Sequence, residues 1–139
     1  MTNDRQMNLK SQIVDMILKS IPGCLAIYRF GSWGTVDERY DSDLDLAILP
    51  SAPTDTVKRW ELAQKLACIV GRDVDLIDLL TASTVLRMQL VANGERLYCS
   101  ADEDVEVFED LVYAGYARFN EERSEILDDI RVRGSVYAK

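Results

Sequence analysis

The chain has 139 residues, of which 47% are hydrophobic and 29% charged, and 16 Lys and Arg against 24 Asp and Glu give a net charge of −8. This composition is typical of a globular protein, and its acidic balance argues against direct nucleic-acid binding, which needs a basic surface. No apolar stretch is long enough to span a membrane and the polar N-terminus does not resemble a signal peptide, so we expect a cytoplasmic protein without a membrane partner.

The first half of the chain alternates between helical and extended hydrophobic patterns. Apolar residues recur at helical spacing over 5–20 and stop at a Pro-Gly pair, which predicts an amphipathic helix. The apolar run 24–30 leads directly into a Gly-Ser pair and is typical of a buried strand. Polar residues over 33–42 indicate a loop, and residues 44–49 predict a second strand that ends at prolines.

The second half continues this alternation, with glycines marking the ends of helices. Gly71 is a plausible C-terminal stop for one helix, and an Asn-Gly pair ends another. The predicted elements are a helix over 55–70, a strand over 73–79, a helix over 83–92, a short strand over 96–99 and a long helix over 103–127.

This order of elements predicts one compact domain over 1–139, with its core at about 10–127. Helices that alternate with strands favour an α/β or α+β fold, in which the helices pack on one sheet. The tail over 130–139 is expected to be flexible. The long helix carries aromatic residues that we expect in the core, although its apolar residues cover more than one stripe and leave room for a partner surface. These aromatic residues are Phe108, Tyr113, Tyr116 and Phe119.

The chain has no histidine, and its three cysteines are widely spaced among apolar neighbours. We expect Cys24, Cys68 and Cys99 to be buried free thiols rather than a disulfide or a metal site. Without histidine, a general base must be a carboxylate, Lys, Tyr or Cys.

A pair of carboxylates begins the second predicted strand. Side chains alternate along a strand, so Asp43 and Asp45 leave one face while Leu44 and Leu46 enter the core. Two carboxylates on one face repel each other unless they stay hydrated or a cation lies between them. Because Mg²⁺ prefers oxygen ligands and retains water and substrate phosphates, this pair predicts a magnesium site.

A third carboxylate is needed to complete a two-metal site or to accept a proton. Asp75 is the best candidate, because it lies in a predicted strand between Val74 and Leu76. Asp73 lies at the start of that strand and Asp78 alternates to the opposite face, so both rank lower.

Gly31 and Ser32 follow a buried strand, where the missing Cβ of glycine lets the backbone approach phosphate oxygens and serine adds donors. We expect Trp33 to pack in the core rather than stack on a base. Three arginines could steer phosphates, although a solvated side chain is the ordinary expectation for each. They are Arg29, Arg39 and Arg72.

Taken together, Gly31-Ser32, ten intervening residues and Asp43-Leu44-Asp45 resemble the signature of the minimal nucleotidyltransferase family, within the DNA polymerase β-like superfamily. Asp75 matches the third acidic residue of that family, and the segment 86–98 is similar to its helix-then-strand ending. The resemblance implies a polymerase β-like nucleotidyltransferase fold with a small mixed sheet. It further implies two Mg²⁺ ions and ATP as substrate, with Asp43, Asp45 and Asp75 as catalytic and metal-binding residues and Gly31 and Ser32 as nucleotide-binding residues.

The resemblance also implies a function. Stand-alone relatives of this size often act as antitoxins that transfer AMP from Mg-ATP to a hydroxyl, here a tyrosine, of a HEPN ribonuclease toxin encoded nearby. Two alternatives are an antitoxin that acts by binding alone and a nucleotidyltransferase that modifies a small molecule. Family members often carry Arg soon after Gly-Ser, where this chain has Trp33 and Gly34, and Arg39 is a weak substitute.

Overall fold

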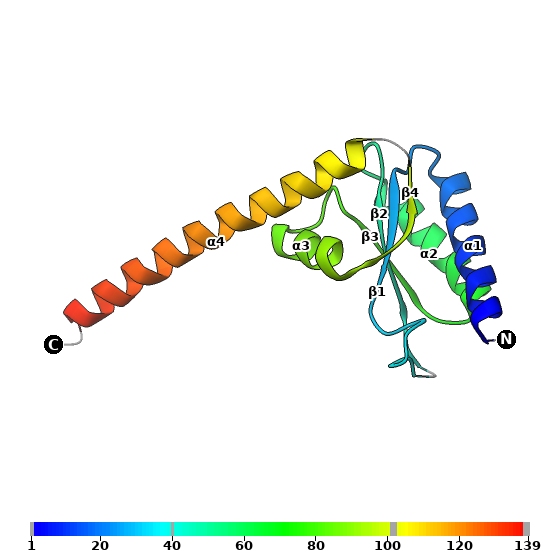
Figure 1. The fold of residues 1–139 in the computed structure, drawn as a ribbon, viewed down its shortest axis with the longest axis horizontal. Helices are drawn as coiled ribbons and strands as arrows, with labels where there is room; N and C mark the ends of the chain where they lie inside the picture. The colour runs from blue at the N-terminus through cyan, green and yellow to red at the C-terminus, as the bar shows by residue number, and fades with distance from the viewer. Residues whose placement is uncertain (1, 40, 101–102, 138–139) are drawn as a thin grey trace.

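The computed structural model describes residues 2–39, 41–100 and 103–137. All eight predicted elements are found, in the predicted order (Figure 1). The helices are α1 (Thr2–Ser20), α2 (Thr56–Val70), α3 (Thr84–Asn93) and α4 (Asp104–Tyr137). The strands are β1 (Ala26–Phe30), β2 (Leu44–Leu49), β3 (Val74–Asp78) and β4 (Glu95–Cys99).

The four strands form one mixed sheet in the order β3-β2-β1-β4. β1 runs antiparallel to both β2 and β4, whereas β2 and β3 are parallel. The end of β1 therefore meets the starts of β2, β3 and β4 at one edge of the sheet, at the bottom of Figure 1. We call this edge, where the loop 31–43 lies, the acidic end.

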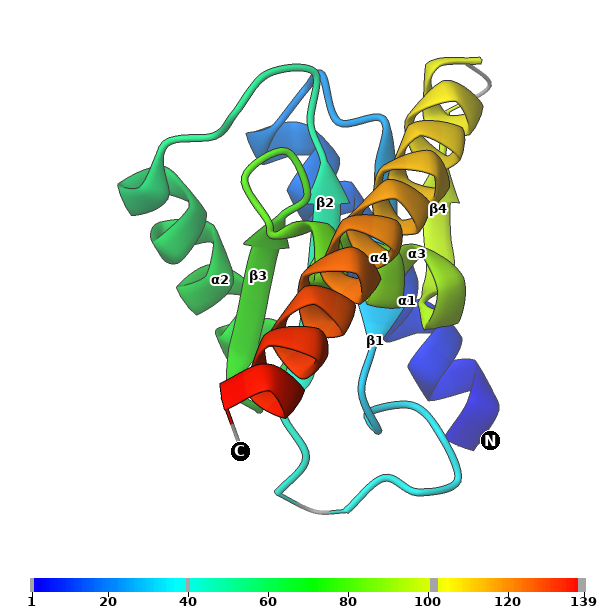
Figure 2. The ribbon, with the colours of Figure 1, turned by 90° about the vertical axis from the view of Figure 1, so that its left-hand side faces the viewer.

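Helices cover both faces of the sheet (Figures 1 and 2). α1 and α2 cover one face, and α3 and the first turns of α4 cover the other. On β2, Leu44, Leu46 and Ile48 pack beneath α1 and α2, while Ala47 and Leu49 pack toward α3 and α4. Burial on both faces explains why this strand is an almost continuous apolar run after Asp45.

α4 differs from its prediction in length and in burial. It continues to Tyr137, so the predicted end of the helix at 127 is wrong, whereas the flexibility expected over 130–139 stays a prediction. Residues 121–132 contain no glycine or proline to stop the helix. Val105 and Val112 are buried, but Tyr113 is 43% exposed and Phe119 is 38% exposed, because α4 extends away from the body after its first turns (Figure 1).

The cysteine prediction is confirmed in part. All three thiols are free, but only Cys24 of the three is buried. Cys68 lies on the exposed side of α2 and Cys99 at the end of the edge strand β4, so apolar sequence neighbours did not indicate burial. Within the described ranges, no helix combines the length and the apolar character that a membrane span requires.

Candidate active site

Two carboxylates lie side by side at the acidic end of the sheet. Asp45 is the second residue of β2, Asp75 is the second residue of β3, and the parallel register pairs them. Leu46 and Leu76 point into the core beneath α1 and α2. Alternation therefore directs both carboxylates to the opposite face, the one that α3 and α4 cover further along. Asp43 precedes β2 by one residue and is exposed.

The carboxylates interact electrostatically. Partial burial raises the pKa of Asp45 above its ordinary value, and the negative charges of Asp75 and Asp43 raise it further. A divalent cation between these groups would relieve the repulsion. The donor set consists of oxygens, which suits Mg²⁺.

The carboxylates do not by themselves form a closed metal cage. No group of three or more His, Cys, Asp or Glu side chains within the described residues is arranged to hold an ion. Mg²⁺ is usually bound by one or two carboxylates together with water and substrate phosphates, so this arrangement fits an ion that arrives with a nucleotide.

The Gly31 turn lies directly against Asp45. Gly31 has φ of +78°, in the left-handed region, and a Cβ built on it would collide with Oδ2 of Asp45. The backbone conformation therefore favours glycine at this position, and a side chain there would force the Asp45 carboxylate to move. The contact brings the predicted phosphate-binding turn and the predicted metal ligand together.

The loop that joins the turn to Asp43 is braced at both ends. The hydroxyls of Ser32 and Ser42 lie 3.0 Å apart across its base. Arg72 donates to the carbonyl oxygens of Arg39 and Ser42, each at 2.9 Å. Arg29 holds the other end, and its side chain is buried rather than solvated.

Sequence reasoning named Arg29 and Arg72 only as possible phosphate-steering side chains and missed that they brace the loop. Arg29 shares its strand face with Ile27, a core residue, and this alternation was an available signal that it is buried. The carbonyl partners of Arg72 could not be predicted, because they depend on the path of the loop. Arg39 is exposed, and its main chain rather than its side chain takes part in the bracing.

The structure also shows where Trp33, Asp78 and Asp73 lie. Trp33 is 3% exposed and belongs to the core beneath α1 and α2, so packing is confirmed for it. Asp78 is buried and accepts bonds from Thr54 and from the N–H of Leu80, which is a structural role. Asp73 is exposed just before β3.

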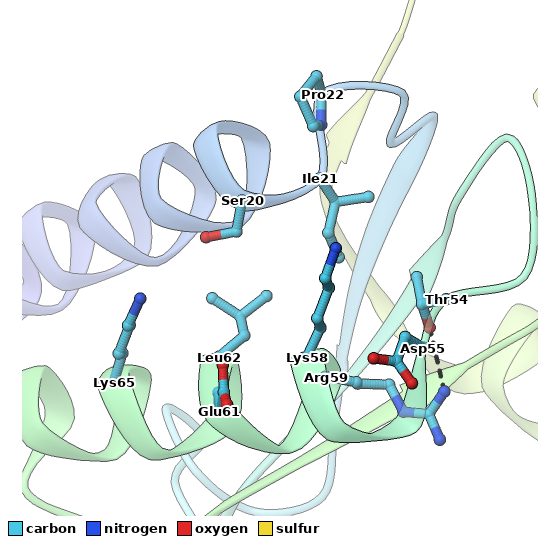
Figure 3. A pocket seen from close by; sticks show the side chains of 10 residues that line it. All are labelled: Ser20, Ile21, Pro22, Thr54, Asp55, Lys58, Arg59, Glu61, Leu62 and Lys65. Carbon is cyan, nitrogen blue, oxygen red and sulfur yellow. Dashed lines mark hydrogen bonds between the residues drawn. The ribbon is translucent and has the colours of Figure 1, made fainter.

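A hollow of about 550 Å³ lies at the opposite end of the sheet, between the end of α1 and the first turns of α2 (Figure 3). Lys58 and Lys65 project from α2 into it, while Arg59 turns toward Thr54, its hydrogen-bond partner. Its lining includes none of the predicted site residues. Two other hollows, of about 530 and 280 Å³, lie beside Asp43 and Asp75.

Comparison with known proteins identifies the family to which this chain belongs. Residues 11–103 match the family described as "Polymerase beta, Nucleotidyltransferase". The chain is 39% identical, over 126 residues, to the protein adenylyltransferase MntA of Shewanella oneidensis, covering 91% of this chain and 89% of that protein.

Two solved structures resemble the whole fold. One is a tri-AMPylated Shewanella oneidensis HEPN toxin in complex with its MNT antitoxin, with a TM-score of 0.76, 38% identity and coverage of 90% of this chain and 98% of that chain. The other is a toxin–antitoxin with AMP-PNP, with a TM-score of 0.78, 39% identity and coverage of 87% and 97%.

The fold and the matched region define an enzyme that transfers nucleotides and takes a nucleotide as substrate. The chain belongs to the polymerase β nucleotidyltransferase family. The predicted family and fold class are thereby confirmed.

Proposed function

We propose that the chain is an antitoxin that transfers AMP from ATP to a tyrosine hydroxyl of a HEPN toxin, releasing pyrophosphate and neutralising the toxin. The observation that carries this proposal is the contact between Gly31 and Asp45, with Asp75 paired beside them. The similarity to MntA and to a complex that holds an AMPylated HEPN toxin supports the acceptor and the partner.

The predicted site residues at the acidic end each have a role in this proposal. Asp43, Asp45 and Asp75 would hold two Mg²⁺ ions, whose charge would neutralise that of the phosphates. Gly31 and Ser32 hold the β- and γ-phosphates. The tyrosine oxygen bonds to the α-phosphorus while the bond to the α–β bridging oxygen breaks. Asp75 accepts the tyrosine proton, since the chain has no histidine to do so.

The exposed part of α4 supports a protein partner. Leu111, Ile126 and Ile130 are 66%, 60% and 58% exposed, which is unusual for large aliphatic residues on one helix. α4 leaves the body on the side of α3, the face from which Asp45 and Asp75 project (Figure 1). A toxin bound along α4 would therefore lie on the same side as the carboxylates.

The test measures AMP transfer to the toxin by the Asp43→Asn/Asp45→Asn double variant. The wild-type chain, the purified HEPN toxin and Mg-ATP should give toxin whose intact mass rises in steps of one AMP. The double variant should give no such increase, while Asp37→Asn, which changes an exposed carboxylate of the same loop, should behave as wild type. Undiminished transfer by the double variant would refute the assignment.

A second candidate function is neutralisation by binding alone, and the apolar surface of α4 is the observation that favours it. The same double variant separates the two functions in cells. If it still rescues growth in the presence of the toxin, binding suffices. Loss of rescue, with the complex still formed, shows that AMP transfer is required.

A further inference from the structure

We propose that Arg29 is a positioning residue, which orients the peptide groups of residues 31–34 so that their N–H groups face the phosphates of the bound nucleotide. This inference rests on the proposed function, which places those phosphates at Gly31 and Ser32.

One nitrogen of Arg29 holds two carbonyl groups of the turn. Nη1 donates to the oxygen of Gly31 at 3.0 Å and to the oxygen of Trp33 at 2.7 Å. A trans peptide directs its C=O and its following N–H to opposite sides, and the described chain has no cis peptide. The N–H groups of Ser32 and Gly34 are therefore turned away from Arg29.

The carbonyl between these two is also occupied. The oxygen of Ser32 accepts bonds from the N–H and the hydroxyl of Thr35, at 3.0 and 2.6 Å. By contrast, the N–H groups of Ser32, Trp33 and Gly34 donate to no acceptor among the residues that the structure describes. A turn that satisfies successive carbonyls internally and leaves successive N–H groups available is an anion-binding nest.

Arg29 lies on the opposite face of the sheet from Asp45. Alternation puts it on the face of Ile27, beneath α1, whereas Asp45 leaves the opposite face. Its guanidinium is engaged by the two carbonyls and by Glu95, which accepts from Nε at 3.0 Å and also from Lys10 at 2.7 Å. Arg29 is thus fixed as a brace and does not itself reach the phosphates.

The test compares the affinities of Mg-AMP-PNP and AMP, measured by isothermal titration calorimetry on the full chain. Arg29→Met should raise the dissociation constant of Mg-AMP-PNP by about tenfold, the equivalent of one charge-assisted hydrogen bond. The affinity for AMP should stay within about twofold, since AMP lacks the β- and γ-phosphates. Arg29→Lys should recover part of the loss, because its ammonium still reaches the carbonyls.

Arg87 provides a matched control. Its partly buried guanidinium also holds two backbone carbonyls, those of Leu79 and Leu80, but at the other end of the sheet. Arg87→Met should lower the melting temperature without changing the ratio of the two affinities. If Arg29→Met does not fold, Glu95→Gln serves instead, because it removes the carboxylate that fixes Nε and should shift the same ratio.

An unchanged ratio of the two affinities in a folded Arg29 or Glu95 variant would overturn the inference about Arg29, whether both affinities stay the same or fall equally. Failure of the wild-type chain to bind Mg-AMP-PNP would instead refute the proposed function, so the two failures are distinguishable.

Discussion

Asp45 and Asp75 stand in register on two neighbouring parallel strands, so two carboxylates are held side by side by backbone pairing rather than by a flexible loop. Such an arrangement is costly while no cation is present, because like charges are fixed close together and Asp45 is partly buried. The first prediction follows from this cost.

Asp45→Asn should abolish AMP transfer and yet stabilise the metal-free protein. The folded state raises the pKa of Asp45, so stability from this group is complete below its ordinary pKa and is lost as pH rises through the raised value. In EDTA at pH 7 the variant should melt above wild type, and the difference should vanish below about pH 4. Thermal unfolding at both pH values measures this, and equal melting temperatures at pH 7 would contradict it.

Gly31→Ala should reduce activity more than Gly71→Ala does. Both glycines have left-handed φ angles, +78° and +74°, so alanine introduces similar backbone strain of about 1 kcal/mol at each. At Gly71 the added Cβ meets nothing within 4 Å, whereas at Gly31 it meets Asp45. Chemical denaturation should show comparable losses of stability, while AMP transfer should fall at least about tenfold for Gly31→Ala alone. Equal activities would show that the contact with Asp45 is unimportant.

Arg72→Met should loosen the end of the loop that precedes Asp43. The substitution removes two hydrogen bonds, to the carbonyl oxygens of Arg39 and Ser42. Amide hydrogen exchange should rise over residues 41–44, whereas Arg39→Met, which changes an exposed side chain of the same loop, should have a smaller effect. Identical exchange in the two variants would show that Arg72 does not brace the loop.

Charges on the exposed face of α4 should weaken the toxin complex selectively. Ile126→Glu and Ile130→Glu place carboxylates on a surface that has no packing partner among the described residues, so the melting temperature should change little. Binding to the HEPN toxin should weaken by about tenfold or more, with nucleotide affinity unchanged. Glu121→Gln, on the opposite side of α4, is the control. Wild-type affinity of both isoleucine variants would exclude this surface from the interface.

Local sequence patterns were sufficient to predict the helices and strands and the face of a strand on which a side chain lies. Alternation around Leu44 and Leu46 predicted which way Asp45 points, and alternation around Leu76 singled out Asp75, whereas their pairing on neighbouring strands is known only from the structure. The order and type of all eight elements followed from hydrophobic period and from breakers.

Contacts between distant residues were not predictable in this way. Arg29 is held by Glu95, which is 66 positions away, and by carbonyls whose direction depends on two left-handed glycines. The exposure of Cys68 and Phe119 depends on where each helix meets the body, and a hydrophobic pattern alone does not contain that information.

The continuous helix of α4 also defines a distance. Residues 112–132 span about 30 Å at 1.5 Å per residue, and the start of the same helix packs on α3 and, through the buried Val105, on the sheet. A partner bound along this part of α4 is held at a fixed distance from the carboxylates and in a fixed orientation. In the proposed complex, the modified tyrosine is then selected by where it lies on the toxin, and the sequence around it contributes little to the choice.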